Sequence, residues 1–105
     1  MIDNGSERRN FARERTDLPV TVRSGMRQVQ AKVEYLGFGG AFVSVSKTFL
    51  ADSVVELEMD LPDQPVSFRG SARVVWVHKN KAMGLQFLDL PSCERLKLEQ
   101  FLLSS

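Results

Sequence analysis

The chain has 105 residues, of which 43% are apolar and 26% charged, and its formal net charge at pH 7 is +1. This length suits one domain with one hydrophobic core, and the balanced charge excludes a strong overall field that attracts nucleic acid or an anionic membrane. The single cysteine, Cys93, excludes an internal disulfide and fits a reducing compartment. No uncharged apolar run reaches the ~18–20 residues of a membrane-spanning helix, and the polar first residues lack the apolar stretch of a signal peptide. The composition therefore predicts a soluble, cytoplasmic domain without membrane insertion.

The N-terminal segment is first polar and then strongly basic. Residues 1–6 have little to bury, which predicts disorder, and residues 7–17 form a charged arm. Residues 8–15 hold four arginines and one acid, a net charge of +3. Arg9 and Arg13 are four residues apart and can converge on one anion, because guanidinium groups bind phosphate and the O6/N7 edge of guanine. On composition alone, a solvated basic tail is the alternative.

From residue 18 to residue 90 the sequence follows the period of two that is typical of half-buried β-strands. Within residues 27–37, for example, Val33 and Tyr35 fall on one face and Glu34 on the other. Turn residues separate six such segments, at 18–25, 27–37, 40–46, 52–62, 66–78 and 81–90. Gly70 indicates a bulge or bend within the fifth segment. Six strands of this kind predict a mainly β fold, an antiparallel barrel or sandwich.

The C-terminal residues 91–105 change to a helical period. Leu98, Phe101 and Leu102 have the spacing i, i+3, i+4, and Glu94 suits the first turn of a helix. We expect one short helix that packs its apolar stripe on the barrel.

Catalytic and metal-binding patterns are not found in the sequence. His78 ends an apolar strand beside Lys79 and Lys81, which predicts a surface histidine. A metal site normally needs three or four ligands, and one histidine and one cysteine in different elements do not supply them. Cys93 has no evident base partner and is predicted to be a buried packing thiol. The glycines of residues 37–40 are not followed by the Gly-Lys-Ser/Thr of a P-loop, so we predict neither an enzyme nor a cofactor.

The order of the segments ERRNFAR, VEYLGFGGAFVSV, SARVVWV and MGLQFLDL, followed by a short helix, resembles the PilZ domain family. The resemblance runs from about residue 7 to residue 103, and it implies a single domain over 7–105. It also implies a six-stranded antiparallel β-barrel with one C-terminal α-helix. The role implied for such a domain is bacterial signalling, in which the domain binds the second messenger cyclic di-GMP and then contacts a partner protein.

Two motifs of the family carry nucleotide binding. The first, Arg-x-x-x-Arg, matches Arg9 to Arg13 in this sequence. The resemblance implies that these two arginines hold guanine and phosphate, with the adjacent Arg8 in support.

The second motif, Asp/Asn-x-Ser-x-x-Gly, falls on residues 35–40 and is degenerate. Only Gly40 matches, because Tyr35 replaces the acid or amide and Gly37 replaces the serine. A shift of the alignment by one residue places Glu34 at the acidic position, but it requires a bulge to keep the glycines aligned.

This departure has a physical consequence. A carboxylate accepts hydrogen bonds from guanine N1–H and N2–H, and loss of the carboxylate and the hydroxyl costs about 2–4 kcal/mol. A micromolar site then falls towards the millimolar range. Stacking of a base on Tyr35 compensates by ~1–3 kcal/mol, and Gly37 permits a closer approach to the backbone. We expect the lost hydrogen bonds to outweigh the stacking on Tyr35, so that nucleotide binding is weakened.

We therefore predict a PilZ signalling adaptor whose nucleotide binding is weakened or lost and which acts through protein contact, with Phe11 and Phe38 as exposed apolar candidates. The alternative is a competent cyclic di-GMP receptor that uses the arginine arm. A nucleic-acid binder is disfavoured, because the net charge is only +1 and the chain has one Trp and one Tyr.

Overall fold

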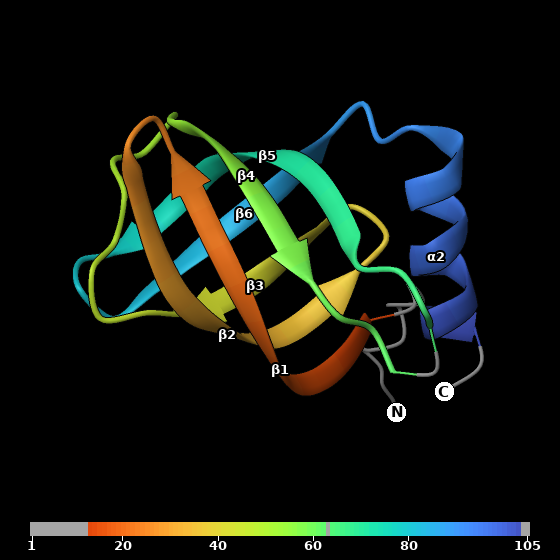
Figure 1. Cartoon of the computed structure of the whole chain (residues 1–105). Helices are drawn as coiled ribbons and strands as arrows, with labels where there is room; N and C mark the ends of the chain where they lie inside the picture. The colour runs from red at the N-terminus through yellow and green to blue at the C-terminus, as the bar shows by residue number, and fades with distance from the viewer. Residues whose placement is uncertain (1–12, 63, 104–105) are drawn as a thin grey trace.

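The structure, a computed structural model, describes residues 13–62 and 64–103, with side chains from residue 16 onward. In this part of the chain six strands precede one helix: β1 Arg13–Ser24, β2 Arg27–Gly37, β3 Gly40–Ser44, β4 Val54–Met59, β5 Phe68–His78, β6 Ala82–Leu88 and α2 Ser92–Leu103. All neighbouring strands are antiparallel and close into a barrel in the order β1-β2-β3-β6-β5-β4 (Figure 1). The predicted mainly β barrel with a C-terminal α-helix is confirmed.

The barrel has two different ends. The first, which we call the loop end, consists of residues 25–27, 45–53 and 78–81, where β1 meets β2, β3 meets β4 and β5 meets β6. The second, the helix end, carries the β2–β3 turn, the β4–β5 connection and α2 (Figure 1). No helix in the described residues is long and apolar enough to cross a membrane.

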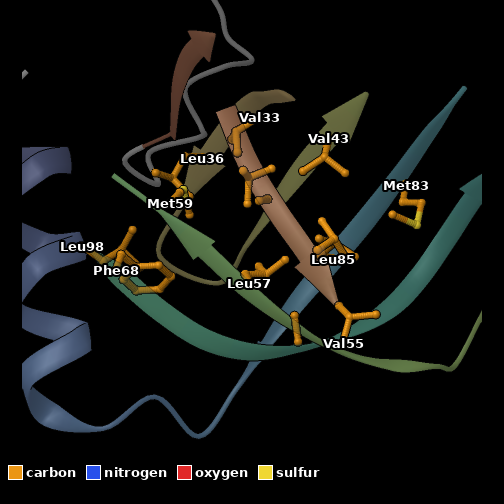
Figure 2. Close-up of a cluster of buried hydrophobic side chains, with 14 of the residues drawn as sticks. Val33, Leu36, Val43, Val55, Leu57, Met59, Phe68, Met83, Leu85 and Leu98 are labelled. Atoms are coloured by element: carbon orange, nitrogen blue, oxygen red, sulfur yellow. The ribbon is translucent and has the colours of Figure 1, made fainter. Parts of the chain in front are cut away.

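The core follows from the alternation of side chains along the strands. In β4, Val55, Leu57 and Met59 are buried, and the acidic residues between them face outward. From α2, Leu98 reaches the core beside Phe68 and covers the helix end of the barrel (Figure 2). The helix is held there by polar contacts as well, since Lys97 Nζ donates to the carbonyl of Ser67 at 2.9 Å.

Gly70 does not mark a bulge. The β4–β5 ladder runs without a shift through the pair Leu57–Gly70. A Cβ at position 70 would lie 2.7 Å from Cδ2 of Leu90, so glycine is needed to admit that side chain. The bulge part of the prediction is therefore wrong.

Two single residues of interest both lie at the surface. His78 is exposed, as predicted, and its ring meets that of Trp76 edge-on with centroids 6.3 Å apart. Cys93 is exposed too, so its predicted burial is wrong. It lies five residues before the buried Leu98, and at about 100° per residue this places it about 140° around the helix from the packed face.

Candidate functional site

The end of the arginine arm meets the glycine turn through strand pairing. β1 begins at Arg13, whose Cα pairs with that of Gly37, and Arg15 pairs with Tyr35. Antiparallel neighbours of this kind have Cα atoms about 4.5–5.5 Å apart. Residues 13–17, expected in the arm, are thus part of β1. Arg8 and Arg9 lie outside the described residues.

A β-bulge in β2 determines where Tyr35 points. Val33 pairs with Val43, but Tyr35 pairs with Phe42, so Glu34 is an extra residue in the ladder. An extra residue reverses the alternation beyond it. Val33 and Leu36 are therefore buried, whereas Tyr35 is 37% exposed. The prediction that Tyr35 shares the face of Val33 is wrong for this reason.

A second bulge, in β5, exposes two large apolar side chains. Val74 pairs with Leu85 and Trp76 with Gly84, which leaves Val75 as the extra residue. Val75 and Trp76 are consequently both about half exposed, at 48% and 47%.

The two bulges together produce a row of aromatic side chains on the outside of the barrel. We call Tyr35, Phe42 and Trp76 the aromatic row. Ring centroids are 6.3 Å apart for Tyr35 and Phe42, and 5.5 Å apart for Phe42 and Trp76. The row takes its side chains from β2, β3 and β5 and crosses β6, where Gly84 pairs with both Phe42 and Trp76.

Between the glycine turn and the aromatic row lies a hollow of about 440 Å³, a size within the range of small-molecule sites. Its lining consists of Tyr35, Gly37, Phe38, Gly39, Gly40, Ala41, Phe42, Val75, Gly84 and Leu85. Among these residues no side chain is charged, and the phenol of Tyr35 is the one polar side chain. The hollow suits an apolar or planar group, but the described residues that line it offer no carboxylate to a hydrogen-bond donor.

The carboxylate that precedes Tyr35 is engaged elsewhere. Ser44 Oγ donates to Glu34 Oε2 at 2.8 Å, and Glu34 is absent from the lining of the hollow. The strand β2 does contain a bulge at Glu34, but the Glu34 carboxylate accepts from Ser44 of β3 and does not line this hollow. In the described residues, no three His, Cys, Asp or Glu side chains gather to hold a metal ion either.

Gly40 has a structural reason to be glycine. A Cβ built on it would lie 2.0 Å from the carbonyl oxygen of Leu85 in β6. At the preceding residue of the turn, the N–H of Phe87 in β6 donates to the carbonyl of Gly39 at 2.9 Å. The turn is thus fixed against β6 by close backbone contact.

The structure brings together part of the site predicted from the sequence. Tyr35, Gly37 and Gly40 line one hollow, and the backbone of Arg13 lies next to it. Phe42, which lines the hollow, and Trp76, which lies next to Phe42 in the aromatic row, were not predicted from the sequence. The run VVWV, in which apolar residues stop alternating, was the available signal for an irregular strand with an outward-facing Trp.

Comparison with known proteins identifies the family. The model of the PilZ domain matches residues 7–104. This chain belongs to the PilZ domain family. A search of curated proteins gave no match.

Two solved structures share the fold of this PilZ domain. The Bacillus subtilis inhibitor of motility, MotI/DgrA, superimposes with a TM-score of 0.78 at 17% identity, covering 92% of this chain and 50% of that chain. This chain thus spans half the length of MotI/DgrA. The PilZ domain of CeSA from a cellulose-synthesizing bacterium superimposes with a TM-score of 0.69 at 19% identity, covering 88% of this chain and 95% of that one. At these identities the likeness shows the fold alone.

Proposed function

We propose that this PilZ domain is a non-catalytic signalling adaptor of the cyclic di-GMP receptor type, in which nucleotide binding is weakened or lost. It acts mainly through contact with a partner protein. The observation that carries the proposal is the apolar lining of the hollow, with Tyr35 and Gly37 at the positions of the acid or amide and the serine.

Hydrogen-bond donors of guanine that find no acceptor would weaken nucleotide binding. A guanine held against this wall loses water from N1–H and N2–H and finds no carboxylate or serine hydroxyl among the described lining residues in return. Buried donors without acceptors cost roughly 1–3 kcal/mol each. The rings of Tyr35 and Phe42 offer stacking, which recovers part of this cost but supplies no selectivity for guanine.

The same features support protein contact. Aromatic side chains are enriched in the centres of protein interfaces, where charged residues are depleted. The aromatic row and Phe38, which is 40% exposed as expected, provide such a surface on a closed barrel. MotI/DgrA is an inhibitor of motility, and we extend to this chain only the general role of a regulator.

Isothermal titration calorimetry with cyclic di-GMP tests the proposal. We expect the wild type to bind in the millimolar range, and the double variant Tyr35→Asp/Gly37→Ser to bind at least ~30-fold more tightly, which corresponds to about 2 kcal/mol. The control Tyr35→Phe keeps the ring without adding an acceptor and should show no gain. Low-micromolar binding by the wild type would refute the weakening.

A competent receptor that uses Arg8, Arg9 and Arg13 is the second candidate, and the pairing of Arg13 with Gly37 favours it. This pairing attaches the arm directly beside the hollow. In the same titration Arg9→Ala and Arg13→Ala should then abolish the signal, whereas Arg23→Ala, at the far end of β1, should not. If the two arm variants bind like the wild type, the arm does not hold the ligand.

A further inference from the structure

The loop end is one continuous surface, because contacts join its three segments. The N–H of Val45 donates to the carbonyl of Lys81 at 2.9 Å, and the N–H of Asn80 donates to Thr48 Oγ1 at 3.1 Å. The Arg27 guanidinium lies 4.3 Å from the centre of the Phe49 ring, a cation–π contact. The β1–β2 turn and the β5–β6 turn are therefore both fixed to the β3–β4 loop (Figure 1).

Positive charge is concentrated on this surface. Its exposed cations are Arg27, Lys47, Lys79 and Lys81, against the single carboxylate of Asp52. With His78 neutral, the loop end carries a net charge of +3, so the remainder of a chain with net charge +1 carries −2. The small net charge of the whole chain therefore does not indicate the positive charge of the loop end.

Two apolar side chains protrude among these cations. Met26, at the tip of the β1–β2 turn, is fully exposed, and Leu50 is 82% exposed. They adjoin Arg27 and Phe49 in sequence, so both flank the cation–π contact. Large apolar residues with this exposure bury little of their surface in the described fold and are available to a partner.

We propose that the loop end docks on an anionic lipid surface. The cations face the headgroups, and Met26 and Leu50 contact the apolar boundary beneath them. This inference is independent of the proposed function and uses none of the residues of the hollow.

Charge complementarity requires an anionic partner, and two observations favour lipid over an acidic protein. Three of the four cations are lysines, which are depleted in protein interfaces but suit the diffuse charge of a membrane surface. The apolar side chains also protrude instead of lining a recess for a partner's anchor residue. In this orientation the helix end, which carries the glycine turn between β2 and β3, points away from the lipid (Figure 1).

Vesicle co-sedimentation tests this proposal. We expect the full chain to bind vesicles of phosphatidylcholine mixed with phosphatidylglycerol, to bind weakly if at all to pure phosphatidylcholine, and to lose binding as salt rises. At roughly fivefold per lysine, Lys79→Gln/Lys81→Gln should weaken partitioning about 25-fold. Met26→Ser/Leu50→Ser should also weaken partitioning while leaving its salt dependence unchanged.

Matched controls come from the helix end, where Val66 and Arg69 are exposed. Val66→Ser and Arg69→Gln should leave vesicle binding unchanged, and thermal unfolding should show that every variant is folded. Equal binding to both vesicle types, or equal loss in the controls, would overturn the proposal. Binding to poly-glutamate without binding to anionic vesicles would overturn it too, in favour of an acidic polypeptide partner.

Discussion

At the scale of single residues, Gly40 shows that a motif position can be required by the fold. It is the one residue of the second PilZ motif that this chain retains. Its Cα faces the backbone of β6 so closely that a Cβ would overlap the Leu85 carbonyl. Retention of Gly40 is therefore no sign of retained nucleotide binding.

The neighbouring glycine provides a matched control for this interpretation. A Cβ at Gly39 would have no heavy atom within 4 Å. Gly40→Ala should lower the free energy of unfolding by at least ~2 kcal/mol, because backbone atoms of β6 must move. Gly39→Ala should leave it unchanged within ~0.5 kcal/mol or raise it slightly. Urea unfolding measures both, and equal stability of the two variants would show that the turn absorbs the methyl group.

At the scale of elements, β4 and the two bulged strands show what the sequence does and does not predict. Alternation placed Val55, Leu57 and Met59 in the core correctly, because β4 pairs without irregularity. Alternation gave the wrong face for Tyr35, because one extra residue in β2 reverses the faces of the strand beyond it. The residues at this bulge are of ordinary types, so the sequence does not indicate that a bulge is present. The glycine turn of the site was predictable from a local motif. The aromatic row was predictable only in part, because the run VVWV signals an irregular strand at Trp76, but the approach of Tyr35, Phe42 and Trp76 to one another depends on the register of separate strands.

The helix allows a prediction at the same scale. In α2, Leu98 is fully buried whereas Leu96 is 53% exposed. Leu98→Ala should therefore cost about 2–5 kcal/mol through lost burial and a residual cavity, and Leu96→Ala should stay within about 0.5 kcal/mol of the wild type. Chemical denaturation followed by circular dichroism distinguishes them. Similar losses in both would mean that the outer face of α2 is packed in solution.

At the scale of the whole molecule, barrel closure depends on contacts between distant parts of the chain. β1 and β4 pair through Val20 with Met59 and Val22 with Leu57, so strands more than thirty residues apart must meet before the barrel closes. The entropy of closing such loops has to be met before the contacts form. Local hairpins join β1 to β2 and β5 to β6, but these hairpins do not close the barrel by themselves.

This topology predicts slow folding for a chain of this size. Barrels dominated by non-local pairing fold in milliseconds to seconds, whereas helical bundles of similar length fold in microseconds to milliseconds. Trp76 is the single tryptophan, and its ring contacts that of Phe42 in the folded barrel, so its fluorescence should change on folding. Stopped-flow refolding from urea should show a main phase in the millisecond-to-second range.

Val22→Ala, at the pairing of β1 with β4, should speed unfolding more than it slows refolding if the barrel closes late in folding. If Val22→Ala instead slows refolding more than it speeds unfolding, the pairing of β1 with β4 is part of the folding nucleus. For the wild type, a main refolding phase faster than about 100 μs would contradict the slow folding expected from the topology.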